Sequence, residues 1–214
     1  MVLHLNYWES PETTAIFQDN PPSEMVKKYT SLLDLESNVL DLGCGGGRHT
    51  ALILKYGHKV HFVDKYNSMI QATLDVLAGN HTEKYSYQEG SITDFNFTEK
   101  FDMSVVWGVF HQAESYEEFS EAVELQSKAL KTGGLLLVNI FAESEEGVLS
   151  FNKVGKNLYR SEQDVDTLLI KPELILKTFK QYGFEIIELE FKDVKIDVGT
   201  RSMLKMALRL TKIN

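Results

Sequence analysis

The sequence predicts an α/β fold with a doubly wound, mostly parallel sheet of seven strands and an antiparallel strand at the C-terminus. Short apolar runs alternate with segments of helical periodicity between residues 38 and 183. The apolar runs are continuous, which is typical of parallel strands covered on both faces. The segments 184–194 and 202–213 instead alternate apolar and polar side chains, as half-buried antiparallel strands do.

Five apolar runs predict the parallel strands of the sheet. Each is short and rich in β-branched, leucine or aromatic residues, and right-handed crossovers would connect them. The run at 84–90 is the weakest of the five because it is the most polar. The predicted strands span residues 38–43, 58–64, 84–90, 101–109 and 133–141.

Helices are predicted before, between and after these strands. Most of the helical segments end on a glycine, the residue that best tolerates the left-handed C-cap conformation. Ser23 is a candidate N-cap, and Pro172 lies in the first turn of the last helix. The predicted helices span residues 23–33, 48–57, 67–79, 115–133 and 171–183.

The two alternating segments predict the last strands of the sheet. In the first, Ile187, Leu189 and Phe191 share one face, with glutamates between them. In the second, the apolar residues are Leu204, Met206, Leu208 and Leu210. We expect each strand to bury its apolar face and expose the other.

The length of 214 residues predicts a single domain over 1–214. Residues 1–36 would form an N-terminal cap and helix. Residues 142–170 interrupt the alternation of strands and helices. They are too polar to belong to the core and too long to be an ordinary loop. We interpret them as a functional insertion near the substrate or as a mobile surface excursion, with Tyr159 and Arg160 as candidate pocket residues.

The formal net charge of −9 disfavours a nucleic-acid partner, because an acidic surface repels the phosphate backbone. The single cysteine allows neither an intramolecular disulfide nor a paired-cysteine zinc site, so we expect no metal. No basic region followed by an apolar stretch opens the chain, and every apolar run is shorter than the roughly 20 residues of a membrane span. We therefore expect a cytoplasmic protein that is a monomer or homodimer and does not bind membranes.

A glycine-rich stretch, "VLDLGCGGGRHT" at residues 39–50, joins the first predicted strand to the helix that follows it. Ligands of open α/β sheets bind at the carboxyl ends of strands, where helix N-termini offer free N–H groups. Glycines at this position let a ligand lie against the backbone. The stretch therefore predicts a cofactor site.

The spacing of the glycines discriminates between two cofactor classes. The dinucleotide pattern G-x-G-x-x-G fits Gly43 and Gly45, but Arg48 occupies its third glycine position. The pattern acidic-x-G-x-G-x-G is matched at every step by Asp41, Gly43, Gly45 and Gly47.

On these residues the sequence resembles the class I S-adenosylmethionine-dependent methyltransferases, in particular small stand-alone members of the tellurite-resistance and ubiquinone-biosynthesis types. The resemblance covers residues 38–141 and, more loosely, those from 171 onward. It implies a Rossmann-like fold and S-adenosyl-L-methionine as cofactor. The implied cofactor-binding residues are Asp41, Gly43, Cys44, Gly45, Gly47, Asp64, Lys65, Ser91, Ile92 and Trp107.

The resemblance also implies individual roles. Asp41 would help hold the methionine ammonium, and Asp64 would accept both ribose hydroxyls. Ser91 replaces the acid that usually meets the adenine amino group, while Ile92 would offer its backbone N–H. Trp107 would contribute its carbonyl, and its indole would be a pocket wall or core. In many relatives an N-terminal aromatic residue touches the cofactor, and Tyr7, Trp8 and Phe17 are the candidates here. The alternative is that these side chains simply anchor the N-terminal segment by hydrophobic contact.

His111 is the candidate catalytic residue. An unperturbed imidazole titrates near neutral pH, so this side chain could orient or deprotonate a substrate. The resemblance includes members that carry histidine here without acid–base chemistry. Cys44 has two interpretations as well: a helix N-terminus could lower its pKa, or it could be a small apolar filler.

The resemblance implies methyl transfer to a small-molecule acceptor by in-line displacement, which depends mainly on placement of the reactants. The acidic charge and the single modest insertion favour a small acceptor. Two alternatives remain, an NAD-dependent oxidoreductase and a non-catalytic cofactor-binding protein. Arg48 and the antiparallel C-terminal segments disfavour the first.

Overall fold

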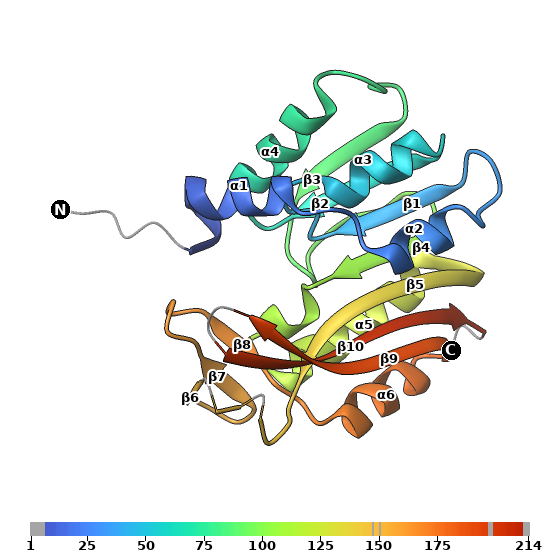
Figure 1. Cartoon of the computed structure of the whole chain (residues 1–214). Coiled ribbons are helices and arrows are strands. Elements are labelled where there is room, and N and C mark those ends of the chain that lie inside the picture. Colours follow the sequence, from blue (N-terminus) through green and yellow to red (C-terminus); the bar gives the residue numbers. More distant parts are fainter. Residues whose placement is uncertain (1–6, 147, 150, 197–198, 212–214) are drawn as a thin grey trace. The chain divides into compact units, whose positions relative to one another are not determined.

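A computed structural model describes residues 7–146, 148–149, 151–196 and 199–211. The chain divides into two compact units, Met1–Val105 and Val106–Asn214 (Figure 1). The strands of the main sheet are β1 (Asn38–Leu42), β2 (Lys59–Asp64), β3 (Tyr85–Glu89), β4 (Phe101–Trp107), β5 (Leu130–Ala142), β9 (Phe184–Ile196) and β10 (Gly199–Leu210).

These strands form one seven-stranded sheet in the order β3-β2-β1-β4-β5-β10-β9. Neighbours β3, β2, β1 and β4 are parallel, whereas β10 is antiparallel to both β5 and β9. The predicted doubly wound, mostly parallel sheet with an antiparallel C-terminal strand is confirmed. The prediction of a single domain over 1–214 stays a prediction, and residues 1–6 of its N-terminal cap lie outside the described residues.

The first unit places the carboxyl ends of β1 and β2 side by side. In the β1–β2 register Asp41 pairs with Phe62, and in the β1–β4 register it pairs with Val105. From β1 the chain adds β2 and then β3 on one side, and it returns to add β4 on the other side of β1. The boundary between β1 and β4 is the topological switch point, where ligands of such sheets bind. The helical elements of this unit are η1 (Tyr7–Glu9), α1 (Pro11–Asp19), α2 (Glu24–Thr30), α3 (Arg48–Lys55) and α4 (Asn67–Leu77).

Helix α1 was not predicted from the sequence. Ser10 caps it by accepting the Thr13 N–H at 3.1 Å, and Pro11 occupies its first turn. The helix packs against α3 and α4 (Figure 1). The run Ser10-Pro11-Glu12 was the available signal, since it places a cap, a proline and an acid in order.

The second unit is built on an aromatic core. Phe110, Phe119 and Phe179 are fully buried, and their ring centroids lie 5.6 to 6.0 Å apart. These side chains come from the three helical elements of the unit, which are η2 (Phe110–Gln112), α5 (Tyr116–Ala129) and α6 (Pro172–Gln181). Edge-to-face packing of this kind adds to the burial of apolar area.

The predicted end of the helix before β5 is wrong. Helix α5 stops at Ala129 instead of continuing to residue 133. Leu130 is extended and fully buried in the first position of β5, so burial in the sheet overrides its helical propensity.

Only one of the two terminal strands buries its apolar face as predicted. On β10 the side chains of Leu204, Met206, Leu208 and Leu210 are buried. On β9 Ile187, Leu189 and Phe191 are 42%, 45% and 51% exposed, so the prediction of half-burial is wrong there. Strand β9 forms the edge of the sheet, where fewer neighbours cover its side chains.

The segment 142–170 forms a small three-stranded antiparallel sheet of β6 (Asn152–Lys153), β7 (Leu158–Arg160) and β8 (Asp166–Leu168). The two ends of this segment lie next to each other, because the Glu143 N–H donates to the Ile170 carbonyl at 2.9 Å. Its last residues Leu168, Leu169 and Ile170 are buried, so the expectation that it is too polar for core is wrong for this end.

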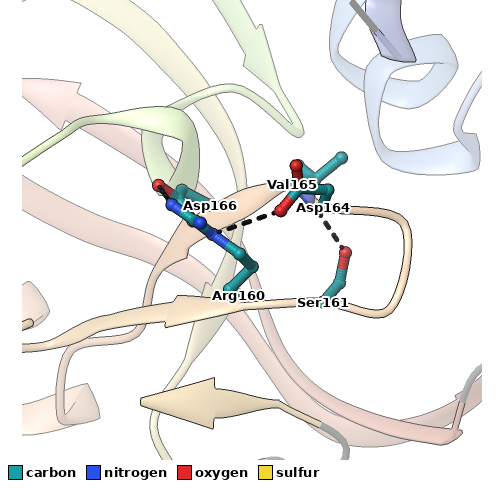
Figure 2. Close-up of polar contacts among 5 residues, drawn as sticks. All are labelled: Arg160, Ser161, Asp164, Val165 and Asp166. Atoms are coloured by element: carbon teal, nitrogen blue, oxygen red, sulfur yellow. Dashed lines mark hydrogen bonds and ion pairs between the residues drawn. The ribbon is translucent and has the colours of Figure 1, made fainter. Parts of the chain in front are cut away.

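Arg160 fixes the pairing of β7 with β8. Its guanidinium donates to both carboxylate oxygens of Asp166, at 2.6 and 2.9 Å, and lies 3.5 Å from Asp164 (Figure 2). Ser161 accepts the Val165 N–H and closes the turn between the strands. Within the described ranges, no helix has both the length and the apolar character that a bilayer crossing requires.

Candidate functional site

The glycine loop after β1 is tied to the end of β2. The N–H groups of Gly43 and Cys44 donate to the Val63 carbonyl at 2.7 and 3.1 Å. Gly45 and Gly47 have φ values of 55° and 82°, in the left-handed region that glycine tolerates best. The loop therefore depends on glycine for its backbone course.

Asp64 holds this loop through its carboxylate. One oxygen accepts the Gly45 N–H at 2.9 Å, and the other accepts the Tyr66 N–H at 3.1 Å. The side chain is buried, and desolvation raises its pKa, while the bonds to backbone N–H groups oppose that shift. The backbone N–H groups therefore fix the position of the carboxylate between the loop and the end of β2.

Asp41 lies beneath the loop and is only 1% exposed. Its carboxylate accepts the Thr50 hydroxyl at 2.6 Å, from the first turn of α3. Burial raises the pKa of Asp41 to about 6; the Thr50 bond and the charge of Arg48 oppose this, and the charge of Asp64 adds to it. A nearby cation would stabilise the ionised form.

Cys44 is a buried thiol. Desolvation and the neighbouring charges of Asp64 and Asp41 raise its pKa well above the ordinary value. The interpretation that a helix N-terminus lowers the pKa of Cys44 is therefore wrong, and the filler interpretation fits its burial. Thr73 of α4 donates to the Gly45 carbonyl at 2.9 Å and lies 3.3 Å from the sulfur.

Helix α1 and helix α4 enclose the loop from two sides. A Cβ atom on Gly46 would lie 2.4 Å from the Gln18 nitrogen, and one on Gly47 would lie 2.9 Å from the Thr73 Cα. Phe17 lies against Gly45, and Gln18 donates to the Ala72 carbonyl at 3.1 Å. Sequence reasoning missed Gln18, Thr50 and Thr73, because one polar residue in a helix gives no periodic signal.

The residues after β2 and β3 complete this side of the first unit. The Gly90 N–H donates to the Asp64 carbonyl at 2.9 Å, which brings the segment after β3 to the end of β2. Ser91 accepts the Thr93 N–H in a local turn, and Ile92 is buried. Lys65 is exposed, with its ammonium 6.0 Å from the Tyr66 ring.

His111 lies in the second unit, buried in η2. Its Nδ1 accepts the Phe141 N–H at 3.4 Å, and its ring centroid lies 4.2 Å from that of Phe141. Burial, and then the charge of Arg201, lower the pKa of His111 to about 3. The expectation that it titrates near neutral pH is therefore wrong: the imidazole is neutral and carries its proton on Nε2.

Trp107 is the last residue of β4 and is half-buried. The next residue, Gly108, donates its N–H to the Asn139 carbonyl of β5 at 2.9 Å. Of the two pocket candidates in the segment 142–170, Tyr159 is buried, whereas Arg160 is exposed and paired with Asp166.

Comparison with known proteins agrees with this geometry. Residues 39–134 match the family model described as a methyltransferase domain, which covers the glycine loop. The chain is 28% identical to an uncharacterized methyltransferase of Staphylococcus carnosus over 148 residues, 68% of this chain and 67% of the relative. It is 24% identical to the ubiquinone biosynthesis O-methyltransferase of Rickettsia bellii over 166 residues, 76% and 66% of the two chains.

Solved structures share the fold. The 1,6-didemethyltoxoflavin-N1-methyltransferase of Burkholderia thailandensis, with bound 1,6-didemethyltoxoflavin and S-adenosylhomocysteine, superposes with a TM-score of 0.66 at 18% identity. The match covers 89% of this chain and 80% of that one. Residues 39–134 are therefore similar to a methyltransferase domain, and the chain shares its fold with solved S-adenosylmethionine-dependent methyltransferases.

The chain matches about two thirds of the length of these two curated relatives. The region that matches the family model begins on β1 and ends in β5, so it includes Asp41, Asp64 and His111. The segment 142–170 and strands β9 and β10 lie beyond it.

Proposed function

We propose that this protein is a class I S-adenosylmethionine-dependent methyltransferase, and that it transfers the methyl group of S-adenosylmethionine to a small-molecule acceptor by in-line displacement. The observation that carries the proposal is the pair of buried carboxylates, Asp41 and Asp64, at either side of a loop that depends on glycine. A buried carboxylate is costly in isolation, and a cationic ligand lowers that cost. The ammonium of the cofactor is such a cation.

The residues fit the cofactor one by one. Asp41 would stabilise the methionine ammonium, with Thr50 fixing its carboxylate. Asp64, whose carboxylate is held by the N–H groups of Gly45 and Tyr66, would accept the two ribose hydroxyls. Gly43, Cys44, Gly45 and Gly47 would present backbone to the ligand. The bound cofactor supplies an electrophilic methyl group on a sulfonium, for which no metal or redox step is needed.

Four further residues are assigned to cofactor binding by the resemblance. Ile92 would offer its N–H to the adenine, and Ser91, engaged in a local turn, would contribute little. Lys65 is exposed, which fits a contact at the rim. Trp107 would offer its carbonyl at the end of β4. These assignments rest on the resemblance and on chain position.

His111 is proposed as an orienting group for the acceptor, not as a base. An imidazole whose conjugate acid has a pKa of about 3 abstracts protons poorly at neutral pH. Its Nε2–H remains a hydrogen-bond donor. In-line methyl transfer gains mainly from alignment, so an orienting role suffices.

A small acceptor is supported by the names of two similar proteins, one an O-methyltransferase of ubiquinone biosynthesis and the other a 1,6-didemethyltoxoflavin-N1-methyltransferase. The net charge of −9 also disfavours nucleic acid. We further propose a cytoplasmic location, in keeping with one buried cysteine and no disulfide, and a monomer or homodimer.

Isothermal calorimetry tests the proposal. We expect S-adenosylhomocysteine to bind the wild-type chain, NADH to give no heat, and Asp64→Ala to weaken binding at least tenfold. Asp75→Ala, an exposed carboxylate on α4, is the matched control and should bind as wild type does. Binding of NADH in place of S-adenosylhomocysteine, or wild-type affinity in Asp64→Ala, would overturn it.

A further inference from the structure

A cavity of about 450 Å³ lies at the amino ends of β1, β2 and β3, whose first residues, Asn38, Lys59 and Tyr85, all line it. Every residue that lines it belongs to the first unit. The glycine loop follows the other end of β1, which has five residues. At about 3.3 Å per residue, the cavity and the loop are roughly 15 Å apart. The cavity is therefore separate from the candidate cofactor site.

The connection from β3 to β4 explains why this cavity exists. Parallel strands are usually joined through a helix, but residues 90–100 contain none. The Asn96 N–H donates to the side-chain oxygen of Gln88 at 3.1 Å, which holds this connection beside β3. A loop covers a sheet less completely than a helix does, and space for a ligand remains.

Aromatic rings form much of the cavity wall. Phe97 comes from the loop, Phe101 begins β4, and His61 lies on β2. The centroid of the Phe101 ring lies 6.2 Å from that of Phe97 and 6.3 Å from that of His61. Tyr85 adds a fourth ring to the lining. Flat walls of this kind match the faces of a planar ligand.

His61 brings an unsatisfied polar atom to this wall. Its Nδ1 lies 2.8 Å from the Ser86 hydroxyl, whereas its Nε2 is buried without a hydrogen-bond partner among the residues that the structure describes. Burial lowers the pKa of His61, so the imidazole is neutral at pH 7. A hydroxyl can donate or accept, so Nε2 carries either a lone pair or a proton. A ligand that pairs with Nε2 would recover the cost of leaving it unsatisfied.

The charged side chains of the lining balance one another. They are Lys59, Glu83, Lys84 and Glu99. Lys84 donates to the Gly57 carbonyl at 3.1 Å, and the Asn38 amide donates to Glu99 at 3.3 Å. Two positive and two negative charges give no net attraction for an ion, which favours an uncharged ligand.

We propose that this cavity binds an uncharged planar heteroaromatic molecule, with a ring nitrogen hydrogen-bonded to Nε2 of His61. A ring that has both an N–H and a lone-pair nitrogen satisfies either tautomer of the imidazole. The separation from the glycine loop is too large for methyl transfer, so this ligand is not the methyl acceptor. The proposal goes beyond the proposed function and does not rest on it.

The test compares benzimidazole with indane, which has fused rings of the same size and no nitrogen. Each is titrated into the wild-type protein at pH 8, where both are uncharged, and NMR follows the ring signals of His61, Phe97 and Phe101. We expect benzimidazole to bind at least fivefold more tightly than indane and to shift all three sets of signals. Saturation with S-adenosylhomocysteine should not displace it.

Two variants localise the hydrogen bond. His61→Phe keeps a ring and removes both nitrogens, so the preference for benzimidazole should fall to within about twofold. Tyr87→Phe is the matched control, because it removes one polar atom from an aromatic side chain on the opposite face of the sheet. Tyr87 pairs in register with Phe62, the neighbour of His61, and successive strand residues alternate between faces. This control should keep the preference of the wild type.

Several results would overturn the proposal. They are equal binding of the two compounds, binding of neither, an unchanged preference in His61→Phe, and shifts confined to the glycine loop. Displacement of benzimidazole by S-adenosylhomocysteine would also overturn it, because the two ligands would then share a site. Each of these results leaves the proposed methyl transfer standing, and failure of S-adenosylhomocysteine to bind would count against that function alone.

Discussion

Asp41 makes the stability of the apoprotein depend on pH in a direction opposite to that of most carboxylates. Burial raises its pKa from 3.8 to about 6, so the native state holds a proton between pH 4 and 6 that the unfolded chain has already lost. The contribution of Asp41 to the free energy of unfolding therefore falls as pH rises. Over pH 5 to 7 the fall due to this carboxyl is about 1.3 kcal/mol.

The same shift sets the pH dependence of cofactor binding. On the proposed function, the ammonium of the cofactor requires an ionised Asp41. With a pKa of about 6, the ionised fraction is roughly one in eleven at pH 5 and ten in eleven at pH 7. The apparent Kd for S-adenosylhomocysteine should therefore be about tenfold higher at pH 5 than at pH 7.

Asp41→Asn isolates this contribution because an amide keeps the acceptor for Thr50 and does not titrate. Urea denaturation and calorimetry at pH 5, 6 and 7 would be run on wild type, Asp41→Asn and the exposed control Asp75→Asn. We expect the control to follow wild type. The difference in unfolding free energy between wild type and Asp41→Asn should change by about 1.3 kcal/mol between pH 5 and 7, and Asp41→Asn should lose the tenfold change in Kd. Equal pH dependences in Asp41→Asn and wild type would refute the reasoning.

Two further substitutions probe the loop and the imidazole. Gly46→Ala should lower stability by about 1–3 kcal/mol and weaken S-adenosylhomocysteine binding, because its Cβ would collide with the backbone of α1. A Cβ atom on Gly79 would contact nothing within 4 Å, so Gly79→Ala should lower stability by about 1–2 kcal/mol because of the positive φ and leave binding unchanged. Thermal shift measures the stability of both variants, and calorimetry measures their binding of S-adenosylhomocysteine. His111→Gln should leave the pH profile of kcat between pH 6 and 8 unchanged in shape, and loss of an inflection in that range would contradict the neutral state of His111.

The parts of the fold that the sequence predicted correctly are those encoded by local patterns. Continuous apolar runs predicted β1, β2 and β4, and the alternation of apolar and polar residues predicted β10. The spacing of the glycines after Asp41 predicted the loop, because Gly43, Gly45 and Gly47 adopt positive φ values that other residues rarely adopt. Asp64 could be anticipated because it ends a strand.

The parts that the sequence did not predict depend on neighbours distant in the chain. The end of α5 was misplaced because burial of Leu130 in the sheet outweighs its propensity. The exposure of Phe191 depends on β9 being the edge strand. The pKa of His111 reflects burial and Arg201, which lies 90 residues away in the sequence. No local pattern reports such contacts.

The neutral state of His111 is compatible with the proposed function, because in-line displacement at a sulfonium depends mainly on the placement of donor and acceptor. On that function, the buried carboxylate of Asp41 would stabilise the cationic methyl donor. His111 would orient the acceptor through its Nε2–H, a role that needs a hydrogen-bond donor and no change of protonation state. An acceptor whose nucleophilic atom already carries a lone pair has no proton to lose before attack, so transfer to it requires no protein base.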